Sequence, residues 1–165
     1  MTFPRPAFVM FAAAMALSAP VFGQGASVAF GGIKADPTLP VEVTSETFSV
    51  NQTDGSATFS GGVVIAQGEM RLSAAEVRVE YVTGDQRRID RLIATGGVTL
   101  ASGKDAAEAR EAEYSVAEGV VILRGDVLLT QGPNAISGQV LTVDLATGTG
   151  KMEGRVRTIL NPGGN

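Results

Sequence analysis

A glycine-led motif that occurs four times most constrains the fold of this 165-residue chain. The sequence reads SGGVVIAQG at residues 60–68, TGGVTLASG at 95–103, RGDVLLTQG at 124–132 and, more faintly, EGRVRTIL from Glu153. The leading glycines are Gly61, Gly96, Gly125 and Gly154, at intervals of 35, 29 and 29 residues. Such a period indicates a repeated structural unit. Each unit holds two short runs rich in Val, Ile, Thr and Leu, separated by turn residues, so we expect an all-β fold built from repeated two-strand units.

The apolar residues of each unit lie on one face of its strands. In a strand, successive side chains point to opposite faces. In the first strand of each unit, apolar residues lie two before, two after and four after the glycine. In the second strand they lie three, five and seven residues after a small residue, which is Ala74, Ala109 or Gly138. Because this register repeats, we expect a strand over residues 107–116, although KDAAEAREAEY has high helical propensity.

The leading glycines have the same parity as these apolar residues, so we expect them on the inward face. A glycine inside a strand marks a bulge, a bend or a close approach of two backbones. A bend at the same place in every unit would curl the sheet around its apolar face. For any single glycine, simple packing of two sheets remains an alternative.

Composition excludes several classes of function. The chain has no Cys and no His, so it lacks the thiol nucleophile and the most frequent general base and metal ligands. We expect neither enzymatic activity nor a cofactor. The formal net charge of −4 argues against nucleic acid as a partner. A secreted chain without disulfides is typical of the bacterial periplasm, where a small core needs no such cross-link.

The chain divides into four segments. Residues 1–23 read as a secretory signal peptide, with Arg5, an apolar stretch over 7–17 and a small-residue exit before Gln24. An uncleaved anchor is the alternative, but the stretch is shorter than the ~20 residues of a spanning helix. We expect a flexible lead-in over 24–38, a β-domain over 39–161 and a tail over 162–165.

Several motifs resemble the LptA/OstA-like family of periplasmic lipopolysaccharide-transport proteins. They are VEVTSE at 41–46, FSGGVVIAQG at 59–68, AEV at 75–77, LRGDVLLTQ at 123–131 and ISG at 136–138. The resemblance covers residues 39–160, and its specificity comes from the order and spacing of the motifs.

The resemblance implies a slightly open antiparallel β-jelly roll with an aliphatic groove. A protein of this kind would bridge the periplasm and carry lipopolysaccharide from the inner to the outer membrane, with the lipid A acyl chains in the groove. Its implied partners are lipopolysaccharide, an inner-membrane bitopic transport protein, the N-terminal domain of the outer-membrane translocon and further copies of itself, stacked head to tail through the edges at 41–50 and 151–160.

The family's groove positions predict which residues contact lipid, and the strand parity adds four more. The resemblance gives Val41, Val43, Phe59, Val63, Ile65, Val98, Leu100, Tyr114 and Val116. Parity adds Val127, Leu129, Leu141 and Val143.

Three alternatives to this function differ in what they require of the sequence. The inner-membrane bitopic partner shares the fold but needs a spanning N-terminal helix. A self-assembling structural β-repeat would explain the units and the open edges without a ligand. A hydrolase lacks support, since no His accompanies the Ser and carboxylate residues, and Glu76, Glu80, Glu111 and Glu113 read as a solvated outer face.

Overall fold

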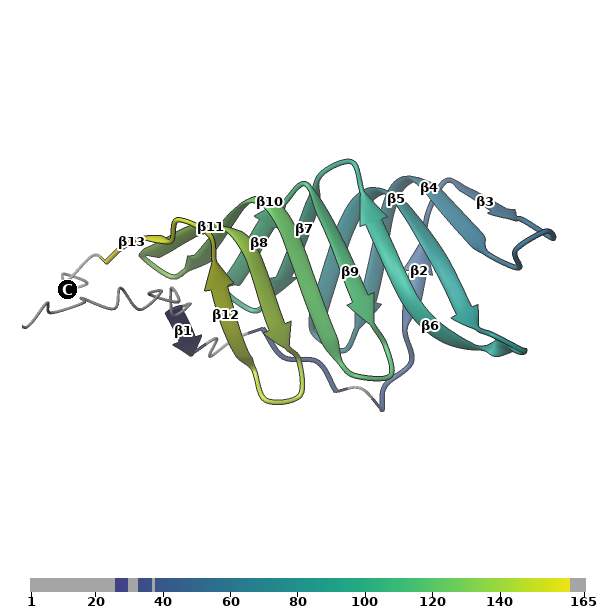
Figure 1. The fold of residues 1–165 in the computed structure, drawn as a ribbon, viewed down its shortest axis with the longest axis horizontal. Coiled ribbons are helices and arrows are strands. Elements are labelled where there is room, and N and C mark those ends of the chain that lie inside the picture. The colour runs from purple at the N-terminus through teal and green to yellow at the C-terminus, as the bar shows by residue number, and fades with distance from the viewer. Residues whose placement is uncertain (1–25, 30–32, 37, 161–165) are drawn as a thin grey trace, which may run out of the picture.

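The computed structural model describes residues 26–29, 33–36 and 38–160, and these form a single antiparallel sheet of thirteen strands (Figure 1). The all-β jelly-roll prediction is therefore confirmed. The strands are β1 (Ala26–Ala29), β2 (Glu42–Thr44), β3 (Thr47–Val50), β4 (Ala57–Gln67), β5 (Met70–Val82), β6 (Asp85–Thr95), β7 (Val98–Ser102), β8 (Asp105–Ala109), β9 (Glu111–Ser115), β10 (Val120–Gln131), β11 (Asn134–Asp144), β12 (Thr149–Glu153) and β13 (Arg157–Ile159). In these described ranges, no helix has the length and apolarity needed to cross a membrane.

The sheet folds over on itself into two facing layers. The pairing order in layer A is β2, β4, β5, β7, β8, β10, β11, β13. Four of these strands are long and contribute only one part to this layer. They are β4 and β10, whose last residues precede the turns at 68–69 and 132–133, and β5 and β11, whose first residues follow those turns. The order in layer B is β3, β4, β5, β6, β9, β10, β11, β12, β1. Long strands such as β4 and β10 thus cross from one layer to the other, and the long axis of the molecule runs across the strands (Figure 1).

The repeated glycines form the crease between the layers. Gly61, Gly96, Gly125 and Gly154 have φ angles of 83°, 82°, 85° and 81°, in the left-handed region that glycine adopts without steric cost. The pairing of β4 with β5 shifts register between Ser60 and Val63, and that of β10 with β11 shifts between Arg124 and Val127. Each is a β-bulge, which bends the strand. The glycines therefore fold every unit at the same point.

The expectation that these glycines face inward is wrong. Gly96 is exposed, and a Cβ atom built on it would lie 2.6 Å from the Cβ of exposed Ala75 on β5. The inward-facing residues that flank this site, Ala94 and Val98, lie four residues apart, so the apolar parity is the same on both sides, while Gly96 and Gly97 are both exposed between them. Glycine is needed there because the neighbouring strand approaches so closely.

Residues 105–115 form two strands rather than a helix. β8 and β9 are separated at Arg110, which lies on the crease, and each pairs with neighbours on both sides. Ala107, Ala112 and Tyr114 point inward and are buried. Strand pairing within the repeat has overridden the local helical propensity.

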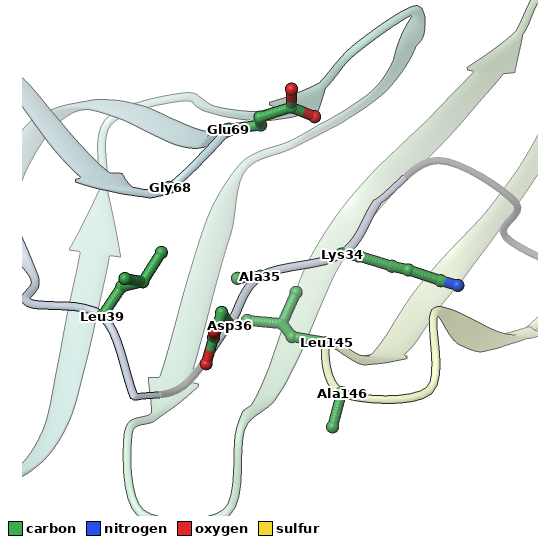
Figure 2. Close-up of a pocket in the computed structure, with 8 residues that line it drawn as sticks. All are labelled: Lys34, Ala35, Asp36, Leu39, Gly68, Glu69, Leu145 and Ala146. Atoms are coloured by element: carbon green, nitrogen blue, oxygen red, sulfur yellow. The ribbon is translucent and has the colours of Figure 1, made fainter.

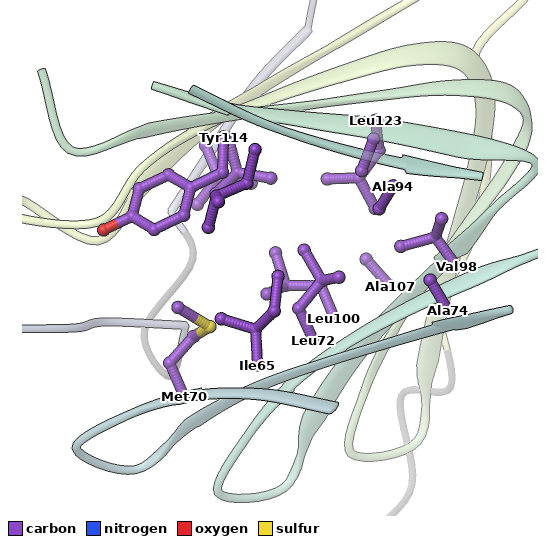
Figure 3. Packing of buried hydrophobic residues seen from close by; sticks show 14 of the residues in the cluster. Ile65, Met70, Leu72, Ala74, Ala94, Val98, Leu100, Ala107, Tyr114 and Leu123 are labelled. Atoms are coloured by element: carbon purple, nitrogen blue, oxygen red, sulfur yellow. The ribbon is translucent and has the colours of Figure 1, made fainter. Parts of the chain in front are cut away.

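The space between the layers is filled by apolar side chains. Figure 3 shows Tyr114, Ala94 and Leu123 of layer B facing Ile65, Leu72, Leu100 and other side chains of layer A. The buried hydrophobic residues belong to one cluster that includes members of every repeat unit. The predicted single apolar face, in register from unit to unit, is confirmed.

The structure differs from the expected lead-in over residues 24–38. Residues 26–29 form β1, which pairs with β12, and Ile33 is fully buried in the core cluster. This segment has no clear sequence period, and its placement comes from pairing with the edge of β12 and from burial of Ile33 in the core. The predicted signal peptide and tail lie outside the described residues.

Two adjacent glycines at the crease, between β6 and β7, test its role. Gly96 and Gly97 have similar φ angles, 82° and 87°, but a Cβ on Gly97 would meet no atom within 4 Å. We expect Gly97→Ala to lower the free energy of unfolding by about 1–2 kcal/mol through backbone strain alone. Gly96→Ala should lose about 1–3 kcal/mol more, because it also forces the strands apart. Urea denaturation of both variants measures the difference, and equal losses would show that the close approach to Ala75 is unimportant.

Candidate functional site: an apolar interior with a polar rim

All thirteen predicted groove residues belong to the interior cluster or pack against it. Nine are at most 2% exposed: Val63, Ile65, Val98, Leu100, Tyr114, Val127, Leu129, Leu141 and Val143. The other four, Val41, Val43, Phe59 and Val116, are half-buried at its margins. The structure thus brings the predicted residues together on one surface, while their contact with lipid stays a prediction.

The interior is closed in this structure. Side chains from the two layers meet across it, and the inward rows of β4, β7 and β10 are almost completely buried. Any ligand that enters between the layers must therefore replace contacts that these side chains make with one another.

A row of polar side chains borders the apolar interior along the ends of the layer A strands. Gln67, Ser102 and Gln131 each lie six residues after a leading glycine, on the inward parity. Gln67 and Ser102 are buried, and the Gln131 amide donates a hydrogen bond to Asp105 across 3.2 Å. These residues follow the mouth, by which we mean the open side of the fold opposite the crease. The interior is thus apolar in depth and polar at its mouth.

One hydrogen-bonded chain crosses the interior from layer to layer. The Tyr114 hydroxyl on β9 donates to Gln67 Oε1 at the end of β4 over 2.6 Å, and Gln67 Nε2 donates to the Leu39 carbonyl over 3.0 Å. Burial raises the pKa of Tyr114 above its ordinary value. Because both side chains are buried, each depends on the other to satisfy its polar atoms.

A segment that we call the strap, the described residues 33–36 and 38–40, lies across the mouth. The Ala35 N–H donates to the Leu145 carbonyl in layer B, and the Leu39 carbonyl accepts from Gln67 in layer A. A pocket of about 520 Å³ opens beside the strap (Figure 2). Its lining combines apolar residues with both signs of charge: Lys34, Ala35, Asp36, Leu39, Gly68, Glu69, Leu145 and Ala146.

Charged side chains gather on the outer face of layer B and pair with each other. Arg91 contacts Glu80 at 2.7 Å and Glu113 at 3.4 Å, and Arg124 contacts Glu113 at 3.6 Å. Glu76 and Glu111 are exposed. This agrees with the predicted solvated face, and the arrangement is a surface ladder of ion pairs, each worth little on its own.

The two ends of the sheet differ in charge. Among the described residues, β2 and β3 pair only with β4 at one end, and β13 pairs only with β11 at the other. Exposed Glu42 lies on β2, whereas exposed Arg157 lies on β13. Exposed apolar side chains also mark the ends: Phe48, Val50, Ile159 and Leu160.

The predicted edge over 151–160 needs a correction. In layer B, β1 pairs with β12 from Ala26 opposite Met152 to Ala29 opposite Thr149. The edge of β12 is therefore covered by β1, and among the described strands at this end it is β13 in layer A and β1 in layer B that present outer edges.

Sequence reasoning missed Ile33, Ala35 and Gln67. Gln67 could have been predicted from the strand parity. The inward positions two and four residues after each leading glycine are apolar, and the next inward position, six residues after it, is polar in three units. No comparable pattern precedes Val41, so nothing in the local sequence shows that the strap packs on the core.

Comparison with known proteins agrees with this architecture. Residues 42–149 match the family described as "LptA/(LptD N-terminal domain) LPS transport protein". The chain belongs to this family. An uncharacterised protein of Rhizobium meliloti (strain 1021) is 26% identical over 156 residues, which cover 88% of this chain and 84% of that protein. The lipopolysaccharide export system protein LptA of Escherichia coli K12 is 28% identical over 122 residues, which cover 71% of this chain and 66% of that protein.

A solved structure shares the fold. The crystal structure of LptH, described as the LptA-homologous periplasmic component of the lipopolysaccharide transport device of Pseudomonas aeruginosa, matches with a TM-score of 0.68 at 16% identity. The match covers 78% of this chain and 99% of that one. The LptA/OstA-like resemblance is confirmed.

The hydrogen bond between Tyr114 and Gln67 makes a stability prediction that depends on pH. Tyr114→Phe should lower the free energy of unfolding by about 1–3 kcal/mol at pH 8, because Gln67 Oε1 loses its buried donor. The raised pKa of Tyr114 means that the unfolded chain ionises first as pH passes about 10. Above this pH the free energy of unfolding of the wild type should fall, and its difference from that of Tyr114→Phe should become smaller. Urea denaturation between pH 8 and 11 measures this, with Tyr81→Phe as the control, and a gap independent of pH would contradict it.

Proposed function

We propose that this protein carries lipopolysaccharide across the periplasm, holding the lipid A acyl chains between its two layers while the sugars project through the mouth. The observation that carries the proposal is the end-to-end apolar interior bordered by the polar row of Gln67, Ser102 and Gln131. Membership of a family of lipopolysaccharide transport proteins supports the same function. The protein then works by binding and transfer, and its chemistry is that of an amphiphile carrier.

The energetics of acyl chains favour such a carrier. Each methylene group that leaves water gains ~0.8 kcal/mol. An acyl chain that slides along a continuous apolar surface keeps this gain at every step. A fold closed on one side and open on the other can enclose the chains and still leave room for a large saccharide.

We further propose that the protein is one link in a bridge between the membranes. The inner-membrane bitopic transport protein would contact one end and the N-terminal domain of the outer-membrane translocon the other, with copies stacked head to tail between them. The free edges of β2, β3 and β13 in the described chain support strand addition at both ends. Exposed apolar residues at those ends, such as Phe48 and Leu160, would be covered by a neighbour.

A structural β-repeat that polymerises without a ligand is the second candidate. The closed, fully packed interior favours it, since a stable core needs no lipid. Both candidates use the same edges, so lipid contact is the property that separates them.

Site-specific photocrosslinking distinguishes an internal lipid site from a solid core. Phe59 is half-buried on the inward face of β4, and Thr58 is its neighbour on the outer face. With a benzophenone amino acid at position 59, we expect a covalent adduct with purified lipopolysaccharide; at position 58 we expect none. Adducts are read by mass shift on gels, after circular dichroism has shown that both variants fold. Stacking without adduct formation at 59 would favour the structural β-repeat.

Opposite charges at the two ends predict the polarity of stacking. Glu42 and Arg157 both lie on the outer face of layer A, on β2 and β13. We expect Arg157→Glu to weaken self-association roughly two- to fivefold at low salt, as loss of one exposed pair would. Mixing it with a Glu42→Lys protein should restore hetero-association. Sedimentation velocity measures both, and an equal affinity of Arg157→Glu and wild type would exclude contact between these ends.

A further inference from the structure

The two layers of the sheet end differently at the β12–β13 end. Layer A ends at β13, which pairs with β11. Layer B continues one strand further, because β1 pairs along four residues of β12. A neighbouring copy that added one strand to each layer would therefore contact β13 in layer A but β1 in layer B (Figure 1).

Strand direction shows that β1 occupies a neighbour's position. Every pairing in the described sheet is antiparallel, and both layers alternate in direction from strand to strand. A second copy placed so that its β2 lies antiparallel to β13 presents its β3 in the same direction as its β2. That β3 is antiparallel to β12 but parallel to β1. Antiparallel alternation therefore continues through both layers only if β3 of the neighbour pairs directly with β12.

The lengths of the two strands agree with this exchange. β1 and β3 each have four residues, ASVA and TFSV. In β3, Phe48 and Val50 are exposed although they lie opposite the inward-facing Phe59 and Ala57. Pairing with β12 of another copy would cover these larger apolar residues, which favours the neighbour's strand over β1.

We propose that β1 is an intramolecular cap on the edge of β12, and that β3 of a second copy displaces it when the protein stacks. The inference rests on the proposed head-to-tail stacking and specifies the surface involved. Free strand edges invite uncontrolled pairing. A short cap of small residues protects this edge in the single molecule and yields to a partner that pairs more extensively.

A disulfide can lock the cap in place, because the chain has no cysteine of its own. Ser27 lies directly opposite Lys151 in the pairing of β1 with β12. When oxidised, the double variant Ser27→Cys/Lys151→Cys should self-associate with an affinity lower by about tenfold or more. On reduction it should regain the affinity of the wild type. The matched control is Leu128→Cys/Ser137→Cys, an opposed pair between β10 and β11 whose disulfide does not restrain β1.

A second variant acts in the opposite direction. Val28→Pro removes a backbone donor from the middle of β1 and should loosen the cap, so we expect tighter self-association than in the wild type.

A mixture of Lys151→Cys and Ser49→Cys proteins should also form a disulfide between copies, since both positions would lie on the outer face of layer B at the junction.

Sedimentation velocity over a concentration series separates the outcomes. Weakened stacking of the oxidised lock, with the control unaffected, supports the cap. If the oxidised lock stacks as tightly as wild type, the cap is excluded while head-to-tail stacking stands. If neither the reduced lock, nor Val28→Pro, nor wild type associates at any concentration, the stacking proposal fails and the cap falls with it.

Discussion

Close backbone approach at the crease is the constraint on which the rest of the structure depends. Each long strand must turn from one layer into the other while its neighbours stay paired, and the glycines with φ near 82° permit this where a side chain would collide with the adjacent strand. Because the bends lie in line, the apolar faces of all units oppose each other. One side of the fold is closed by continuous chain, and the opposite side is left as a mouth.

The repeat allowed the fold and the inward residues to be predicted, since period and parity follow directly from how strands pair. It also corrected the helical propensity of residues 105–113, which no local reading would have done. The outward position of Gly96 could not be predicted, because parity counting assumes a regular strand, whereas two successive residues, Gly96 and Gly97, are both exposed at the crease. The strap and β1 escaped prediction for a different reason: their packing depends on surfaces built by residues far along the chain, such as Leu145 and Met152.

The interior has two competing occupants under the proposed function. Ile33 lies within it, and the hydrogen-bonded Tyr114 and Gln67 span it. Acyl chains would replace these contacts with others of similar apolar character. The strap is hydrogen-bonded to both layers at the mouth, to Leu145 in layer B and to the Gln67 amide in layer A.

The regular spacing of the crease glycines also fixes how such a protein can change in length. One 29-residue interval adds two strands to each layer, or about 10 Å along the molecular axis at ~4.8 Å per strand. An inserted interval would leave Glu42 at one terminus and Arg157 at the other, so the ends would still fit the same neighbours. The span of a chain of such molecules can therefore be adjusted in small steps through the number of units, or in large steps through the number of copies.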